Sequence, residues 1–255
     1  MADEERTRRW QKSERRTPLS DMIGLLRNAI TAVRKAPTDL EARRQLRAIA
    51  TEQGMVDQVS VLMLDEARAN TERPEVAQAF WEELADLYEN LDQPLEVITA
   101  MEQVCSIATR DVDHLDRLAW LYRKAGAWQK AAETFERVGL IAQDDRARAA
   151  MRAAGKLYRD NGRLDRSVAV YRTIVEHRPT DAEAWRSLDD LLAEQGRWAE
   201  LAEVRGHRAR RAASGVEKAA LLRAQARALE QAGDLASAAQ VVKSAANHAP
   251  DDVSG

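Results

Sequence analysis

The chain has 255 residues, of which 45% are hydrophobic and 32% charged, and its formal net charge at pH 7 is −3. A net charge this close to zero argues against a protein that binds nucleic acid or a membrane surface through its overall charge. The single cysteine excludes a disulfide within the chain, and no apolar run approaches the roughly 20 residues that span a bilayer.

The location expected from these features is the cytoplasm. The N-terminal residues are charged and lack the apolar core of a secretory signal peptide. The one cysteine, Cys105, suits a reducing compartment and is expected to be a small buried packing residue. Arginine is used far more often than lysine, which favours a bacterial source with a GC-rich genome.

Residues 1–16 are densely charged around one aromatic residue, Trp10. A composition of this kind indicates a flexible arm. Acidic residues offset much of its positive charge, so a solvated arm is the simpler interpretation and contact with an anionic partner is the alternative.

A single amphipathic helix is expected over residues 17–36. Pro18 suits the first helical position, and apolar residues then recur every three or four places. They are Ile23, Leu26, Ile30 and Val33. Because no partner helix precedes this segment, we expect it to pack on the helices that follow and to cover their N-terminal end.

Residues 148–181 predict two amphipathic helices joined by a tight turn. Small or apolar residues recur at helical spacing on both, at Met151, Ala154, Gly155 and Tyr158, then at Leu164, Ser167, Val168, Tyr171, Ile174 and Val175. Gly162 closes the first helix because glycine accepts the left-handed conformation, and Pro179 ends the second because proline cannot continue a helix. Thr180 follows as the expected cap of the next helix.

The same pattern occurs six times in tandem, in units that start near residues 40, 78, 112, 148, 182 and 219. Where the other units have a glycine between their helices, the unit at 78 has Asp92, which also tolerates the left-handed region. Arg47 and Asp189 replace the small residue of the first helix in two units, and Arg205 replaces the aromatic residue of a second helix. Since no such helix pair can bury its apolar face alone, the repetition predicts a stack of hairpins.

This pattern resembles the tetratricopeptide repeat family, whose unit is about 34 residues and two helices. The array is expected over residues 37–252, with a short tail at 253–255. The resemblance implies an all-α, right-handed solenoid of stacked antiparallel helix hairpins. It also implies a non-enzymatic scaffold that binds a protein or peptide in a concave groove lined by the first helices.

In this family the residues that face the groove lie near the fifth, ninth and twelfth places of each unit. Here they include Glu82, Asp86, Glu89, Trp120, Arg123, Arg152, Lys156, Arg159, Arg186, Arg223 and Arg227. Their order predicts a groove that is acidic toward the N-terminus and basic from Arg123 onward, where an acidic segment of a partner would bind. Trp120 is the expected aromatic anchor. The simpler alternatives are that Trp120 packs under the previous unit and that the charges only solvate helix faces.

No phosphate-loop, dinucleotide or zinc-protease pattern occurs, so neither catalysis nor a cofactor nor a metal is expected. Nucleic acid is an unlikely partner because half of the expected groove is acidic. A nucleic-acid-binding helical repeat and a regulatory fragment of a larger multi-domain protein are the alternatives to a scaffold. The last helix, near residues 235–248, is expected to expose Ala239, Val242 and Ala246. An uncapped C-terminal repeat of this kind is compatible with self-association, with a bound partner, or with a chain cut from a longer protein.

Overall fold

The structure is a computed structural model of the chain and describes residues 19–52 and 54–248. The expected arm at 1–16, the first two residues of the expected 17–36 helix and the tail at 253–255 lie outside the described residues. Thirteen α-helices and no strand occur in the described part, so the predicted all-α fold is confirmed. The chain divides into two compact units, of which unit 1 ends at Gly126 and unit 2 begins at Ala127.

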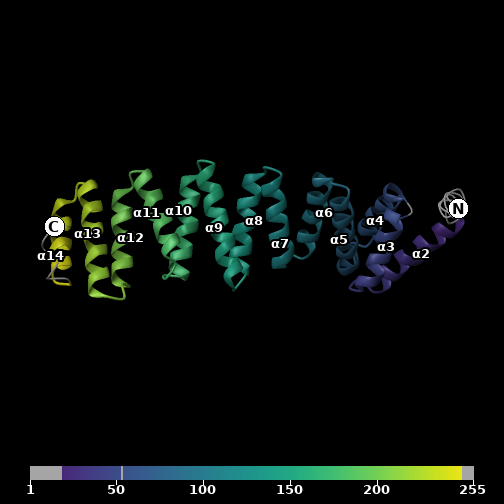
Figure 1. The fold of residues 1–255 in the computed structure, drawn as a ribbon, viewed down its shortest axis with the longest axis horizontal. Helices are drawn as coiled ribbons and strands as arrows, with labels where there is room; N and C mark the ends of the chain where they lie inside the picture. Colours follow the sequence, from purple (N-terminus) through teal and green to yellow (C-terminus); the bar gives the residue numbers. More distant parts are fainter. Residues whose placement is uncertain (1–18, 53, 249–255) are drawn as a thin grey trace, which may run out of the picture. The chain divides into compact units, whose positions relative to one another are not determined.

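The described part of unit 1 consists of six helices, α2 to α7. Their bounds are Leu19–Lys35, Leu40–Glu52, Val56–Ala69, Pro74–Asn90, Pro94–Ile107 and Val112–Lys124. After α2, each helix packs on the one before it (Figure 1). Helix α2 packs on α3 and α5 and buries Leu26, Ile30 and Val33 as predicted. Ile23 is 47% exposed, so the packed face of α2 begins only at Leu26.

In unit 2, the residues up to 248 that the structure describes form seven helices, α8 to α14, that pack in chain order in the same way. Their bounds are Trp128–Ile141, Asp145–Asp160, Leu164–His177, Ala182–Glu194, Trp198–Arg210, Gly215–Gln231 and Leu235–Ala246. The last helix leaves Ala239, Val242 and Ala246 exposed, as expected from the sequence. Self-association through this helix stays a prediction.

The turns between paired helices lie at the predicted residues. Gly162 has a φ of 71°, in the left-handed region that glycine adopts without a steric penalty. Asp92 has a φ of 54° and is the only residue other than glycine with a positive φ in the described part, so its role as the glycine substitute is confirmed. The remaining turn glycines are Gly54, Gly126, Gly196 and Gly233.

Three first helices begin at the predicted residue, and three begin earlier. Helix α5 starts at Pro74 because proline suits the first helical position, and α9 and α13 follow Asp144 and Ser214, whose side chains cap them. Helix α11 is capped by Asp181, whose Oδ1 accepts a backbone N–H over 3.0 Å. The prediction that Thr180 caps this helix was therefore wrong by one position.

Helices α9 and α10 approach closely where Gly155 meets Tyr171. A Cβ atom on Gly155 would lie 2.7 Å from Tyr171 Cε2, and the Gly155 carbonyl accepts a 2.8 Å hydrogen bond from the buried hydroxyl of Ser167. One repeat later the same two positions hold Asp189 and Arg205, and Arg205 Nε donates to Asp189 Oδ2 over 3.0 Å. Asp189 and Arg205, which both depart from the repeat pattern, thus form an ion pair where the preceding repeat has the contact between Gly155 and Tyr171.

Candidate interaction surface

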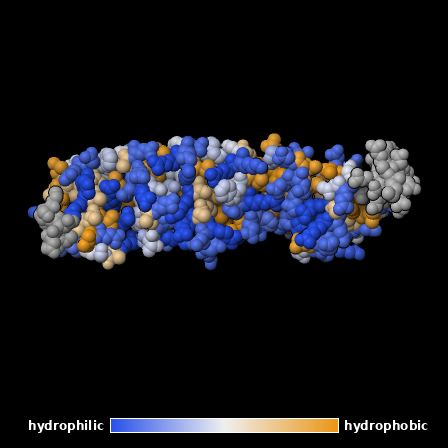
Figure 2. Space-filling view, in the orientation of Figure 1, coloured by the Kyte–Doolittle hydropathy of each residue, from blue (hydrophilic) through white to orange (hydrophobic). Residues whose placement is uncertain are grey.

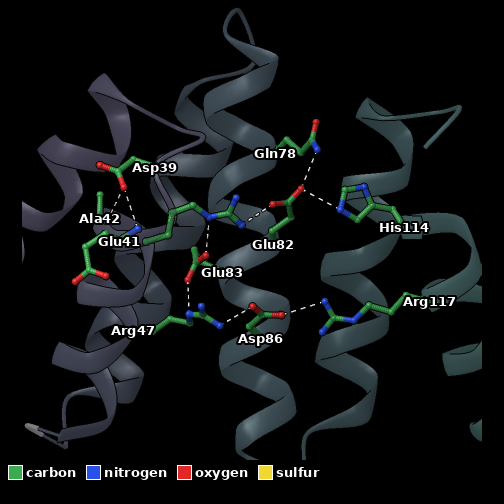
Figure 3. Close-up of polar contacts among 11 residues, drawn as sticks. Asp39, Glu41, Ala42, Arg47, Gln78, Glu82, Glu83, Asp86, His114 and Arg117 are labelled. Atoms are coloured by element: carbon green, nitrogen blue, oxygen red, sulfur yellow. Dashed lines mark hydrogen bonds and ion pairs between the residues drawn. The ribbon is translucent and has the colours of Figure 1, made fainter. Parts of the chain in front are cut away.

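Charged side chains connect the consecutive first helices of unit 1, which are α3, α5 and α7 (Figure 3). The charge network, as we call this set, comprises Arg43, Arg47, Glu82, Glu83, Asp86, His114 and Arg117. Glu83 is 1% exposed, and its two carboxylate oxygens lie 2.6 Å from Arg43 Nε and 2.6 Å from Arg47 Nε. Asp86 forms ion pairs with both neighbours: its Oδ2 lies 2.5 Å from Arg47 Nη1 and its Oδ1 lies 3.0 Å from Arg117 Nη1. These pairs connect α5 to both neighbouring first helices.

Burial and pairing shift the pKa values of this network in opposite directions. Burial raises the pKa of Glu83, although both arginines oppose that change. Burial also acts against ionisation of Glu82, but hydrogen bonds from His114 and Gln78, together with the charge and hydrogen bond of Arg43, outweigh it and lower the pKa of Glu82 to about 2. The hydrogen bond to Glu82 in turn raises the pKa of His114 above its usual 6.5.

His114 lies between two carboxylates, with Nε2 3.1 Å from Glu82 Oε1 and Nδ1 3.3 Å from Asp111 Oδ1. Nδ1 makes no hydrogen bond within the described residues, so its attraction to Asp111 depends on the positive charge of the protonated ring. Arg43, which is paired with Glu82, and Arg117 are the nearby cations. The imidazolium thus joins α5 to the start of α7, and its neutral form would lose one of the two contacts.

This geometry predicts a pH-dependent contribution to stability. Because the pKa of His114 is raised in the folded state, the contribution is complete below about pH 6.5 and is lost as pH rises through the folded-state value. The low pKa of Glu82 means that its own contribution is lost only as pH falls toward 2. We expect His114→Asn to lower the free energy of unfolding by about 1 kcal/mol near pH 5.5 and by less near pH 9.

Urea unfolding of the wild type and His114→Asn between about pH 5 and 9 would measure this difference. The control is His207→Asn, because His207 is exposed on α12. A difference for His114→Asn that stays constant over this pH range would show that the ring acts only through packing.

The acidic residues expected in the groove are already paired. Glu82 contacts Arg43, Asp86 contacts Arg47 and Arg117, and Glu89 Oε2 lies 2.5 Å from Arg117 Nη2. The arginines offset the negative charge that these three residues would otherwise give to this face of unit 1.

Trp120 lies on α7, three residues after Arg117 of the charge network, and is 51% exposed. The guanidinium carbon of Arg123 is 4.8 Å from the centroid of its ring, within the range of a cation–π contact. The indole is therefore neither fully packed under the preceding helices nor fully open to solvent.

The basic residues expected in the groove of unit 2 fall into two groups. Arg152 pairs with Asp181 and with Glu183, and Arg159 Nη2 lies 3.1 Å from Glu194, so both are tied to the neighbouring first helix or its cap. A second group is exposed and has no ion pair within the described residues; its members are Lys156, Arg186 and Arg227. Arg223 is half-buried.

The sequence analysis did not identify the ion-pair partners of Glu82, Asp86 and Arg152. Arg43, Arg117 and Asp181 lie outside the three places per unit that the family pattern assigns to the groove. Their ion pairs join residues that are 39, 31 and 29 positions apart. Opposite charges separated by about one repeat length were the signal that could have indicated them.

Neither a membrane span nor a metal centre occurs in the described part. No helix there is long and apolar enough to cross a bilayer, and the side of each unit seen in Figure 2 is mainly hydrophilic. None of the described His, Cys, Asp and Glu residues form a group of three or more that could hold a metal ion.

Residues 115–149 match the family model described as tetratricopeptide repeat. A comparison with curated protein sequences gives no match. Among solved structures, Naa15/Naa10 bound to HypK-THB is similar with a TM-score of 0.51 and 15% identity, over 88% of this chain and 34% of that chain. This likeness shows the fold.

Two further solved structures are similar over most of their own length. A tetratricopeptide repeat protein from Parabacteroides merdae has 16% identity and a TM-score of 0.35, over 95% of this chain and 92% of that one. The MamA protein has 14% identity and a TM-score of 0.38, over 70% of this chain and 97% of that one.

The family match agrees with the repeated helix pairs and with the left-handed turn residue that closes the first helix of each pair. The chain therefore contains a tetratricopeptide repeat at residues 115–149, within a series of helix pairs of the same design.

Proposed function

We propose that the chain is a non-enzymatic protein-interaction scaffold that holds a peptide or partner segment against the first helices of its repeats. The fold supports this proposal because stacked helix pairs present extended faces suited to binding. The similar Naa15/Naa10 structure is described with HypK bound, which is an association of the kind proposed.

The observation that carries the proposal is the exposure of Trp120. Binding energy at protein interfaces concentrates in tryptophan, tyrosine and arginine, and here a half-exposed tryptophan lies beside an arginine. The partner would place an apolar side chain against the indole and an acidic group near Arg123. In unit 2, the exposed cations Lys156, Arg186 and Arg227 suit acidic residues as well.

The experiment is capture of partners from a lysate of the source cell, followed by mass spectrometry, with the wild type beside Trp120→Ala. We expect the variant to retain about tenfold less of a protein that the wild type retains. Val61→Ala is the matched control, because Val61 is 56% exposed on α4, a second helix of unit 1. If Trp120→Ala retained as much of the partner as the wild type does, the first-helix face would not be the binding surface.

A further inference from the structure

Helices α11 and α12 meet through charged side chains at the middle of their hairpin. Arg205 Nε on α12 lies 3.0 Å from Asp189 Oδ2 on α11, and the two side chains are 22% and 21% exposed. The preceding hairpin of α9 and α10 has close packing at these positions, together with the hydrogen bond from Ser167 to the Gly155 carbonyl. An ion pair that water reaches stabilises a contact less than close packing does, so α11 and α12 form the weaker hairpin.

A pocket of about 390 Å³ lies where α12 meets α10 and α11, at the end of the hairpin that is farther from its turn. Its lining includes three buried apolar residues of α11 and α12, namely Trp185, Leu188 and Val204. The guanidinium of Arg208 lies 5.9 Å from the ring centroid of Trp185, at the outer limit of a cation–π contact. The turn is at Gly196, and the fully buried Leu192 and Leu201 lie on either side of it in the chain. The hairpin is therefore packed near its turn and incompletely filled at the other end, which we call the open end.

Helix α12 packs closely on α13. A Cβ atom on Gly206 would lie 2.7 Å from Gln225 Nε2, so the backbone of α12 comes near the side chains of α13. Arg205 Nη1 also donates to the Ala224 carbonyl over 2.9 Å, which ties this arginine to α13. Helix α14 packs on α13 in turn. The last three helices are thus joined to one another independently of α11.

Helix α12 is joined to α10 by ion pairs that lie near the turn. Arg172 is 2.9 Å from Glu200, and Arg197 is 2.9 Å from Asp165. The side chains of Asp165 and Arg172 are 90% and 42% exposed, so solvent screening leaves both pairs little strength. Arg197 and Glu200 lie at the start of α12, so neither pair crosses the open end.

We propose that α12, α13 and α14 rotate as one body away from α10 and α11 about the turn at Gly196, with the ion pair of Asp189 and Arg205 as the latch. Breaking the latch separates the helices at the open end and uncovers the apolar side chains of Trp185 and Leu188, while Arg205 stays on α13. Local opening of this kind requires less free energy than global unfolding, because only the contacts across one joint are lost. The proposal does not depend on the partner or on Trp120.

The test measures how fast buried thiols of the whole chain react with iodoacetamide, with the labelled peptides quantified by mass spectrometry. Leu188→Cys places a thiol at the open end, at a position that is fully buried. Val168→Cys on α10 and the native Cys105 of unit 1 are also buried and report on opening elsewhere. Arg205→Met breaks the latch, and Arg172→Met is the matched control because it removes an ion pair of α12 near the turn.

We expect the thiol of Leu188→Cys to react at least about tenfold faster than Cys105 of the same molecule and than Val168→Cys. Arg205→Met should accelerate Leu188→Cys about tenfold further and the other two thiols less than about twofold, whereas Arg172→Met should change all three less than about twofold. If Arg205→Met lacks the circular dichroism of the wild type, the comparison of thiols without it decides alone.

The proposal is overturned if Leu188→Cys reacts no faster than the other thiols, or if Arg205→Met accelerates all three equally. It is also overturned if Arg172→Met accelerates Leu188→Cys as much as Arg205→Met does. Failure of the lysate capture with Trp120→Ala would leave this test unaffected.

Discussion

Arg43→Met is expected to lower the free energy of unfolding by about 3–5 kcal/mol, because it removes a cation from a carboxylate that is buried in unit 1. Glu83 is 1% exposed and Arg43 is 9% exposed, so water cannot replace the lost guanidinium. Arg47 still contacts Glu83, but Asp86 shares that arginine. Urea unfolding followed by circular dichroism measures the change.

Two further variants separate the buried charge from general damage to α3. Arg44→Met makes the same substitution at an exposed position next in the chain and should have little effect. Glu83→Gln in the Arg43→Met background removes the unpaired charge and should restore part of the loss. If Arg44→Met were as damaging as Arg43→Met, the ion pair would not be the cause.

Gly155→Leu is expected to lower the free energy of unfolding by about 1–3 kcal/mol, because the new side chain would overlap the ring of Tyr171. The first added atom alone would lie 2.7 Å from Cε2 of that ring. Tyr171 is 7% exposed, so the ring has little room to move, and separating the helices would break the hydrogen bond from Ser167 to the Gly155 carbonyl.

The control is Gly24→Leu on α2, where an added Cβ atom meets no other atom within 4 Å. Leucine has a higher helix propensity than glycine, so this variant should be unchanged or slightly more stable. An unchanged urea midpoint for Gly155→Leu would mean that α9 and α10 do not approach each other at this residue.

The helix pairs could be predicted from the sequence because the turns that end their helices depend on local chemistry. Asp92 is an example, since its position in the repeat predicted a left-handed conformation without knowledge of any tertiary contact. The cap of α11 shows the limit of such reasoning, because Thr180 and Asp181 are both good caps and only the path of the chain decides between them.

The candidate surface was harder to predict because its charges are set by pairs from different repeats. From the sequence, Glu82 and Asp86 predict an acidic face. In the structure Arg43, Arg47 and Arg117 form ion pairs with them and offset that charge. Which residues meet depends on the register between neighbouring first helices, which no single repeat contains. For Trp120, packing and exposure were both compatible with the pattern, because the repeat does not fix how much of this side chain its neighbours cover.

The ion pair between Asp189 and Arg205 bears on how a chain of similar hairpins avoids misassembly. If α12 packed on α9, Arg205 would meet Gly155 and Asp189 would lose its cation. If α10 took the place of α12 against Asp189 on α11, the ring of Tyr171 would cover that carboxylate. Either exchange buries an unpaired charge, which costs several kcal/mol, so the pair marks α11 and α12 as partners while the chain folds.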